Sequence, residues 1–218
     1  MMKYKAALFD LDGTLLDSLE DMANSINCML AEKGYEARSL DEVRSFVGNG
    51  VKKLVQRSLP PHCSEEESEV CLTCFKSHYG EKMQDKTKPY AGIIEALCEL
   101  KRLGVPMAII SNKYDDAVKK LTKEMFGQLI DIAIGTSAKI QPKPAVDGIC
   151  LALEMLGVNP AQALYFGDSE VDVLTAQNAK MDCVGVAWGF REKKVLQECG
   201  ANYIITEPDE IVDFFIAP

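Results

Sequence analysis

The sequence predicts an α/β fold, in which a parallel sheet forms the core and a small all-helical domain is inserted after the first strand. Three observations support this prediction: short apolar runs recur along the chain, helical patterns separate them, and one long stretch near the N-terminus carries helix signals without a convincing strand. Short, nearly unbroken apolar runs are typical of strands buried on both faces. Strands that alternate with helices assemble into a parallel sheet.

The apolar runs give the expected strands, and glycines mark the ends of the expected helices. The strands cover residues 5–9, 106–111, 130–134, 163–167, 183–188 and 202–206. Apolar residues recur at helical spacing over 93–103, 118–126 and 149–156, and each pattern stops at a glycine, a common end of a helix. Pro144 is expected in the first turn of the third helix, where a missing N–H is tolerated.

The stretch from Ser18 to Met83 is the expected all-helical insertion. Apolar residues from Leu19 to Leu30 form one stripe, and Ser39 with Glu42 and Ser64 with Glu67 each fit a capping box. The segment Phe46-Val47-Gly48-Asn49-Gly50 is expected to be a turn, because two glycines around an asparagine favour positive φ. We therefore expect a core domain of residues 1–17 and 84–218 and a cap domain of residues 18–83.

Composition restricts the possible partners. The 218 residues include 24 Lys+Arg and 33 Asp+Glu, and the formal net charge of -9 has the wrong sign for general binding to nucleic acid or to an anionic membrane. The first strand begins too early to leave room for a signal peptide, so a cytoplasmic protein is expected. The eight cysteines lie scattered in apolar segments, which favours reduced thiols over disulfides.

One group of residues in the insertion leaves two interpretations open. Cys71, Cys74 and His78 would share one face of a helix, as metal ligands do. Cys74 also belongs to an apolar stripe with Phe75 and Tyr79, and a buried free cysteine usually behaves as a small hydrophobic residue. The packing interpretation is favoured, and the sequence does not decide whether the group binds anything.

Polar residues follow the apolar runs in a pattern that points to one shared site. They lie in Asp10-Leu11-Asp12-Gly13-Thr14, Ser111-Asn112-Lys113, Gln141-Pro142-Lys143-Pro144 and Gly167-Asp168-Ser169-Glu170-Val171-Asp172. Ligands of a parallel α/β sheet bind beyond the carboxyl ends of its strands. These segments are therefore expected to meet at one edge of the sheet.

The expected site is rich in negative charge. Asp10, Asp12, Asp168 and Asp172 would repel one another by about 4 kcal/mol per pair at 4 Å, for an effective dielectric constant near 20. Lys143 supplies one positive charge, and a hard divalent cation, Mg²⁺ above all, would supply the rest. A metal ion, a lysine, a hydroxyl group and helix N-termini together suit a phosphoryl group.

These motifs, in this order, resemble those of the haloacid dehalogenase superfamily of phosphatases, nearly from end to end of the chain. The resemblance implies a Rossmann-like core and a catalytic cycle with a covalent intermediate. Asp10 would be the nucleophile that forms an aspartyl-phosphate, and Asp12 the general acid and base, whose backbone carbonyl also helps to hold Mg²⁺. The carboxylates of Asp10 and Asp168 would be direct ligands of the ion, and Asp172 a ligand or a partner through water.

The resemblance also implies the phosphate-binding residues and excludes some relatives. Ser111 and Lys143 would bind the transferring oxygens, and Asn112 is expected in the same phosphate-binding set. Dehalogenases of the superfamily lack the second aspartate, so Asp12 indicates phosphoryl transfer. Phosphoglucomutase-type relatives carry a histidine in the first cap segment, and Leu16 to Met29 contains none, so hydrolysis is favoured over mutase chemistry.

Three further segments resemble the phosphoglycolate phosphatase branch: Val47 to Val51, Lys88-Pro89-Tyr90 and Ile110 to Lys113. That branch usually has Pro-Gly after the tyrosine and Thr-Asn-Lys at the strand end, where this chain has Ala91-Gly92 and Ser-Asn-Lys. The insertion would be a mobile cap, and its turn Gly48-Asn49-Gly50 would contact the part of the substrate away from the phosphate. Arg44, Lys52 and Lys53 flank this turn and could meet a substrate carboxylate, although exposed charges more often remain hydrated.

Each of these polar residues also has an ordinary interpretation. Asp168 could cap a helix, Ser111-Asn112 could cap the helix expected from Asp115, and Lys143 could be solvated. Four such clusters after separate strands favour a common site. The leading hypothesis is a Mg²⁺-dependent phosphatase, monomeric or weakly dimeric, that acts on a small phosphorylated metabolite such as 2-phosphoglycolate. The alternatives are a pyrophosphatase or a sugar-phosphate phosphatase or mutase on the same core, and a catalytically silent binding or regulatory protein.

Overall fold

The computed structural model describes residues 3–216. The chain forms two compact units: Asp17–Lys88 is one, and the residues up to Leu16 together with those from Pro89 onward form the other. Each unit is described by itself below. None of the described helices is long and apolar enough to cross a membrane.

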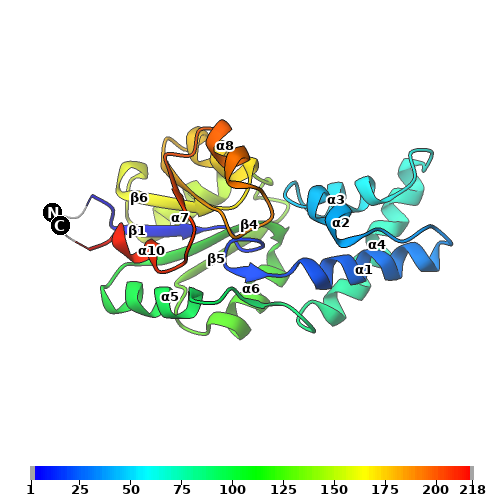
Figure 1. The fold of residues 1–218 in the computed structure, drawn as a ribbon, viewed down its shortest axis with the longest axis horizontal. Helices are drawn as coiled ribbons and strands as arrows, with labels where there is room; N and C mark the ends of the chain where they lie inside the picture. The colour runs from blue at the N-terminus through cyan, green and yellow to red at the C-terminus, as the bar shows by residue number, and fades with distance from the viewer. Residues whose placement is uncertain (1–2, 217–218) are drawn as a thin grey trace. The chain divides into compact units, whose positions relative to one another are not determined.

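The larger unit is built on a six-stranded sheet with the order β5-β4-β1-β6-β7-β8, in which all neighbouring strands are parallel (Figure 1). Its strands are β1 (Ala6–Phe9), β4 (Met107–Tyr114), β5 (Ile132–Thr136), β6 (Ala163–Gly167), β7 (Asp182–Val186) and β8 (Tyr203–Ile205). Because β1 pairs with both β4 and β6, the residue after β1 lies at the centre of the carboxyl edge of the sheet. The predicted α/β class with a parallel sheet is confirmed.

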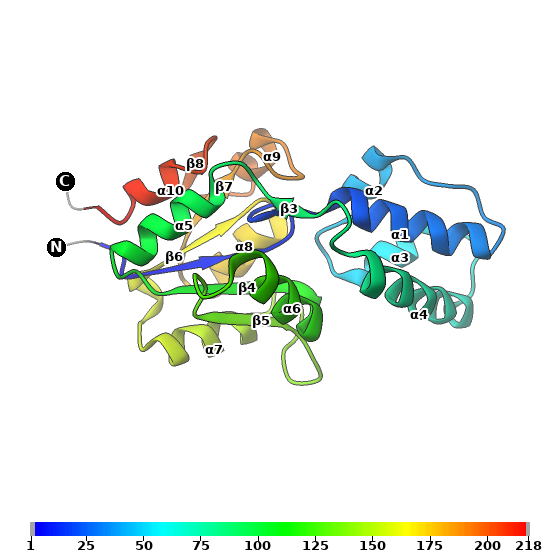
Figure 2. The same ribbon diagram turned by 90° about the horizontal axis from the view of Figure 1, so that it is seen from below.

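Helices connect these strands and cover both faces of the sheet. They are α5 (Ile93–Arg102), α6 (Asp115–Phe126), α7 (Asp147–Leu156), η1 (Pro160–Gln162), α8 (Glu170–Asn178), α9 (Lys193–Glu198) and α10 (Glu210–Asp213). Figure 2 shows α5 and α10 on one face and α7 on the other. The three predicted helices that end at a glycine are present, and Gly157 has the left-handed conformation that such an end requires.

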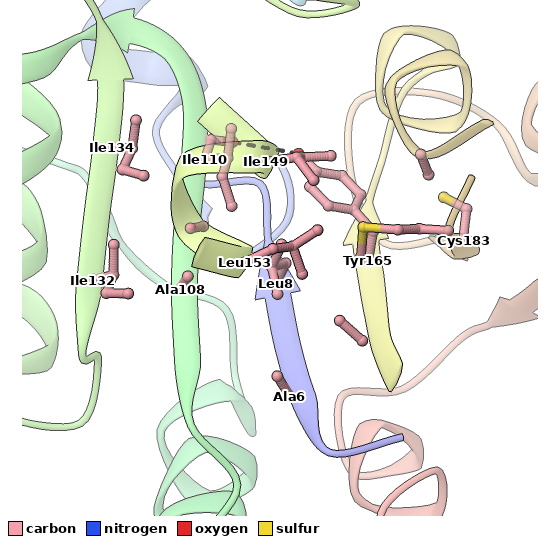
Figure 3. Close-up of a cluster of buried hydrophobic side chains, with 14 of the residues drawn as sticks. Ala6, Leu8, Ala108, Ile110, Ile132, Ile134, Ile149, Leu153, Tyr165 and Cys183 are labelled. Carbon is pink, nitrogen blue, oxygen red and sulfur yellow. Dashed lines mark hydrogen bonds between the residues drawn. The ribbon is translucent and has the colours of Figure 1, made fainter. Parts of the chain in front are cut away.

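One hydrophobic core cluster of this unit lies on the face covered by α7, α8 and α9. Side chains from alternate positions of the central strands, such as Leu8 and Ala108, pack there against Ile149 and Leu153 of α7 (Figure 3). Tyr165 of β6 is fully buried among them, and its hydroxyl donates a hydrogen bond of 3.3 Å to the carbonyl of Ile110. The Tyr165 hydroxyl is thus a polar group within an otherwise apolar layer.

Two sequence-based expectations about this unit were wrong. Strand β4 does not end at Ser111 but continues to Tyr114, because the polar residues stay paired with β5 through an irregular register between Ile110 and Tyr114. Pro144 does not lie in the first turn of α7, since that helix begins at Asp147 with Val146 as its N-cap. Lys143 therefore lies in a loop rather than at a helix N-terminus.

The smaller unit is all-helical apart from the strand residues at its ends. It consists of α1 (Leu19–Glu32), α2 (Leu40–Phe46), α3 (Val51–Ser58) and α4 (Glu65–Lys82), and we call it the cap. Both predicted capping boxes are present at the starts of α2 and α4, and the apolar stripe of α1 is buried. The predicted turn has positive φ at Gly48 (119°) and Gly50 (83°). Two short strands, β2 (Leu16–Asp17) and β3 (Lys88–Pro89), pair with each other where the chain crosses between the units.

Asp21 in the first turn of α1 is buried and binds the segment that leaves α4. Its carboxylate accepts hydrogen bonds from the N–H of Lys86 (3.0 and 3.1 Å), the N–H of Thr87 (2.8 Å) and the Thr87 hydroxyl (2.7 Å). Neutral donors thus stabilise this charge, and they connect the beginning of the cap to its end.

Candidate active site

Asp10 lies at the centre of the candidate site, directly after β1. Its backbone N–H donates to the carbonyl of Phe166 (2.9 Å), which continues the pairing of β1 with β6 by one residue. Its side chain is largely buried, and the Lys143 ammonium donates to Asp10 Oδ1 at 2.7 Å. The sheet therefore fixes the backbone of Asp10, and the lysine fixes its carboxylate.

Lys143 connects Asp10 to the helix after β6. Its buried Nζ donates to Asp10 Oδ1 and to Asp172 Oδ1, both at 2.7 Å, and lies 3.2 Å from the Tyr165 hydroxyl. Burial alone would lower the pKa of Lys143, but the carboxylates of Asp10 and Asp172 outweigh it and hold that pKa well above its usual value. The two carboxylates therefore favour the charged form of Lys143.

Asn112 holds the loop that carries this lysine. The Lys143 N–H donates to Asn112 Oδ1 (2.6 Å), and Asn112 Nδ2 donates to the Lys143 carbonyl (3.2 Å). The side-chain amide expected to bind phosphate is thus engaged with the backbone of Lys143. Ser111, one residue earlier in β4, is also buried, and its hydroxyl accepts a hydrogen bond of 3.2 Å from the Lys113 N–H.

Two aspartates from the end of β6 and the start of α8 complete the central group. Carboxylate oxygens of Asp10, Asp168 and Asp172 all lie within 4.8 Å of one another, and all three residues are buried. Asp172 Oδ2 accepts hydrogen bonds from the N–H (3.1 Å) and the hydroxyl (2.6 Å) of Ser169, while Asp168 Oδ2 accepts one from the Phe190 N–H (2.6 Å). The predicted convergence of these residues is present in the structure.

The central group has more negative charge than its lysine can balance. Burial raises the pKa of Asp10 to about 7, with a further contribution from Asp172, against the lowering effect of Lys143. Burial and the neighbouring Asp172 and Asp10 carboxylates raise the pKa of Asp168 well above its usual value. Three buried carboxyl groups beside one ammonium fit a hard divalent cation, because carboxylate oxygens are the ligands that Mg²⁺ prefers. The donor set therefore suits the expected ion.

Asp12 lies outside this group of three and has a partner of its own. Lys113 Nζ lies 3.1 Å from Asp12 Oδ1, and the lysine side chain is almost completely buried. Sequence reasoning did not single out Lys113, although it follows Ser111 and Asn112 in the same segment. Asp12 therefore lies two residues from Asp10 but is paired with a different lysine.

Glycine at position 13 allows the close packing of the Asp12 loop. Gly13 has a φ of 89°, and a Cβ there would collide with the Asp168 carboxylate and the Phe190 ring. The Trp188 indole N–H donates to the carbonyl of Thr14 at 3.0 Å, so the segment after β7 packs against the same loop. The segment Trp188 to Phe190 was assigned no role from the sequence, because its contribution to the site comes from backbone and ring contacts.

The residues expected to select the substrate belong to the cap and have ionic partners within it. Arg44 pairs with Asp41 at 3.2 Å, and Lys52 pairs with Glu69 at 2.5 Å. These two residues and the turn Gly48-Asn49-Gly50 lie in Asp17–Lys88. The residues around Asp10 described in this subsection all lie in the other unit.

Comparison with known proteins identifies the family. The model of the family of haloacid dehalogenase-like hydrolases matches residues 7–186. A phosphoglycolate phosphatase of Pseudomonas syringae pv. tomato is 38% identical over 93% of this chain and 76% of its own length. A phosphoglycolate phosphatase of Psychrobacter arcticus is 30% identical over 99% of this chain and 97% of its own.

Solved structures agree with this assignment. A crystal structure from Lactobacillus delbrueckii subsp. bulgaricus has a TM-score of 0.94 and 32% identity, with complete coverage of both chains. That of a predicted phosphoglycolate phosphatase from Haemophilus somnus has a TM-score of 0.91 and 27% identity, and 98% of each chain is covered. The chain belongs to the family of haloacid dehalogenase-like hydrolases, and it is a phosphoric monoester hydrolase similar to the phosphoglycolate phosphatases.

Proposed function

We propose that this enzyme hydrolyses a small phosphate monoester, with 2-phosphoglycolate as the best candidate, through an aspartyl-phosphate on Asp10 and with the help of Mg²⁺. The observation that carries the proposal is the buried contact of 2.7 Å between Lys143 Nζ and Asp10 Oδ1, beside the carboxyl groups of Asp168 and Asp172. A carboxylate held in place by a buried ammonium, with a hydroxyl from Ser111 on the neighbouring strand, is arranged for attack on a phosphoryl group.

The first half of the reaction transfers the phosphoryl group to Asp10. A carboxylate oxygen of Asp10 forms a bond to phosphorus while the bond between phosphorus and the ester oxygen breaks. Asp12 gives its proton to the leaving alcohol. Lys143 holds Asp10 in the orientation for attack and, together with the Ser111 hydroxyl, binds the transferring oxygens, while Asn112 holds the loop of Lys143 in place.

The second half returns the enzyme to its starting state. Asp12, now a carboxylate, takes a proton from a water molecule as the water oxygen bonds to phosphorus, and the bond between phosphorus and Asp10 breaks. Inorganic phosphate leaves, and Asp12 again carries a proton. Lys113, 3.1 Å from Asp12 Oδ1, keeps this carboxyl group in one orientation through both steps. Lys113 is therefore assigned to positioning.

Asp10, Asp168 and the backbone carbonyl of Asp12 would hold Mg²⁺, with Asp172 beside them. When bound, the ion supplies positive charge that balances the carboxylates and the phosphoryl oxygens. What supports this part is the excess of buried negative charge described above, since the raised pKa of Asp168 reflects burial and the neighbouring carboxyl groups. Asp172 already accepts hydrogen bonds from Ser169 and Lys143, which suits it to hold those groups rather than to contribute a free oxygen.

The choice of 2-phosphoglycolate rests on the relatives and on the cap. The curated relatives named above are phosphoglycolate phosphatases. We assign contact with the part of the substrate away from the phosphate to Gly48-Asn49-Gly50, with Arg44 and Lys52 as the cations that would meet its carboxylate. Positive φ at both glycines supports a sharp turn at this position.

Phosphate release from a panel of esters tests the proposal. The wild-type protein with Mg²⁺ is expected to release phosphate from 2-phosphoglycolate with the highest kcat/KM in a panel that also contains pyrophosphate and sugar phosphates. Acid quench during turnover of a labelled ester should leave phosphate on the peptide that contains Asp10. Asp116→Asn changes an exposed acid of the same unit. It is the matched control for substitution of Asp10 and should retain activity. A wild type inactive on the whole panel would contradict the enzymatic proposal, and a preference for pyrophosphate would contradict the substrate.

A further inference from the structure

A second group of side chains of metal-ligating types lies in the cap, formed by Glu32, Cys74 and His78. His78 Nε2 is 2.7 Å from Glu32 Oε1, and the Cys74 thiol donates to Glu32 Oε2 at 3.1 Å. One ligand atom from each of the three residues lies within 4.8 Å of the other two. The group is independent of the acidic site of the core, since all three residues belong to Asp17–Lys88.

The arrangement follows from the packing of two helices. Cys74 and His78 are four residues apart on α4 and therefore lie on the same face of that helix. Glu32 is the last residue of α1, which packs along α4 (Figure 2). Of the set expected from the sequence, Cys71 is buried at 1% exposure and does not join the group; Glu32 takes its place.

The three side chains are a zinc donor set. Thiolate, imidazole and carboxylate groups bind Zn²⁺ at about 2.0 to 2.3 Å, which places ligand atoms of a tetrahedral site about 3.5 Å apart. The present contacts of 2.7 and 3.1 Å need only a small outward movement to reach that spacing. The side chain of His78 is 23% exposed and that of Glu32 is 55% exposed, so an ion can enter and a water molecule can reach it.

We propose that Glu32, Cys74 and His78 bind one Zn²⁺ ion, with water as the fourth ligand, and that the ion joins the end of α1 to α4. Binding breaks the S–H bond of Cys74 and releases one proton to solvent, with no change of oxidation state. The bound thiolate and the Glu32 carboxylate balance the charge of the ion. Lys33, the next residue after Glu32, carries one positive charge that offsets the charge of Glu32 before binding.

Cobalt substitution tests the site in the full-length protein. Co²⁺ added under a phosphine reductant and excess Mg²⁺ should give a thiolate-to-metal charge-transfer band in the near ultraviolet and visible bands of a tetrahedral site. The core group offers only carboxyl ligands, so it cannot produce the charge-transfer band. Zn²⁺ should abolish these bands by displacing Co²⁺, and one equivalent should suffice.

Substitution of each ligand provides the decisive comparison. Cys74→Ser should remove the charge-transfer band, and Glu32→Gln and His78→Gln should each weaken Zn²⁺ binding by at least about tenfold, with circular dichroism showing that the variants remain folded. Cys98→Ser, which removes an exposed thiol of the other unit, is the matched control and should leave the band unchanged. A wild type without the band, or a band that survives in Cys74→Ser, would overturn the proposal. Phosphate release tests the proposed function separately, because no ligand of this site takes part in it.

Discussion

Asp10 in the core and Asp21 in the cap are both buried aspartates, but their surroundings stabilise them in different ways. Asp21 accepts hydrogen bonds from the backbone N–H groups of Lys86 and Thr87 and from the Thr87 hydroxyl, all neutral donors. The Asp10 carboxylate accepts a hydrogen bond from the ammonium of Lys143, and two further buried carboxyl groups lie beside it. The hydrogen bonds of Asp21 hold two segments of the cap together. At Asp10, by contrast, the neighbouring carboxyl groups of Asp168 and Asp172 repel the carboxylate.

The comparison separates a structural carboxylate from a reactive one. The hydrogen bonds that Asp21 accepts join the start of α1 to the segment after α4, so its contribution is to the stability of the cap. At Asp10 burial raises the pKa to about 7, against the charge and the hydrogen bond of Lys143, which lower it. A carboxylate in these surroundings is stabilised by a bound cation and is available to react with an incoming phosphoryl group. Substitutions at the two positions should therefore have opposite profiles.

The largest effect is expected from Asp10→Asn. An amide oxygen is a poor nucleophile, so kcat for phosphate release should fall by at least about ten-thousandfold. The free energy of unfolding of the metal-free variant should not fall, because the substitution removes one of three crowded carboxyl groups. Phosphate release and urea unfolding measure the two outcomes. A stability loss as large as that of Asp21→Asn would break the distinction between the two aspartates.

The next effect compares a buried ion pair of the core with an exposed one of the cap. Lys143→Met should lower the free energy of unfolding of the metal-free protein by about 3–5 kcal/mol, because Asp10 and Asp172 lose their shared cation in a buried site. Lys52→Met removes the pair with Glu69, in which both side chains are 51% exposed, and should cost about 0.5 kcal/mol or less. Urea unfolding of both variants checks this, and similar losses would contradict the argument from burial.

Asp21→Asn sharpens the same comparison from the side of the cap. Asparagine keeps one acceptor oxygen but turns an NH₂ group toward the N–H donors of Lys86 and Thr87, which should cost about 2–3 kcal/mol of stability. Asp85→Asn, at an exposed position of the same unit, is the matched control and should have little effect. Unfolding monitored by circular dichroism measures the difference, and an unchanged midpoint for Asp21→Asn would show that these hydrogen bonds contribute nothing.

Lys113→Met tests the role of the second lysine of the site. If Lys113 orients Asp12, kcat should fall by up to about a hundredfold through misplacement of the acid and base, with KM changed much less. The loss should shrink for an aryl phosphate whose leaving group needs no proton. Lys119→Met, which removes an exposed pair with Asp115, should retain full activity. A pure KM effect would assign Lys113 to substrate binding instead.

A pH dependence of Mg²⁺ stabilisation is also expected. Asp10 carries a pKa raised from 3.8 to about 7, so the folded metal-free protein holds its proton across that range while the unfolded chain loses it. Metal-free stability should therefore fall as pH rises between those two values. Mg²⁺ competes with protons for these carboxylates, so it should raise the melting temperature more at pH 8 than at pH 5. Asp168→Asn should reduce that difference, and an equal shift at both pH values would contradict the raised pKa of Asp10.

The sequence predicted the part of the site that depends on strand ends. Asp10 and Asp168 follow apolar runs, and parallel strands bring such residues to one edge wherever the runs pair. It did not predict where β4 ends, since polarity at Ser111 does not prevent pairing with a neighbouring strand. It also missed Tyr165, whose hydroxyl reaches Lys143 from within an apolar run. Such residues are found only once the packing of the sheet and its helices is known.

The same limit applies to side chains that meet through helix packing. The spacing of Cys74 and His78 predicted a shared face of α4, and the structure agrees. Glu32 could not be added from the sequence, because its approach depends on how far α1 runs along α4. The Asp12 partner Lys113 is a similar case, although its place after Ser111 and Asn112 was a signal that could have been used.

The central position of β1 has a consequence for synthesis of the protein. Translation produces β1 long before β4 and β6, the two strands that pair with it. The apolar strand β1 cannot pair until β4 and β6 have been synthesised. The cap helices have more local contacts and can form before then. Asp10 meets Asp168 and Asp172 only after β6 and α8 have left the ribosome. A nascent chain should therefore have no phosphatase activity until late in translation.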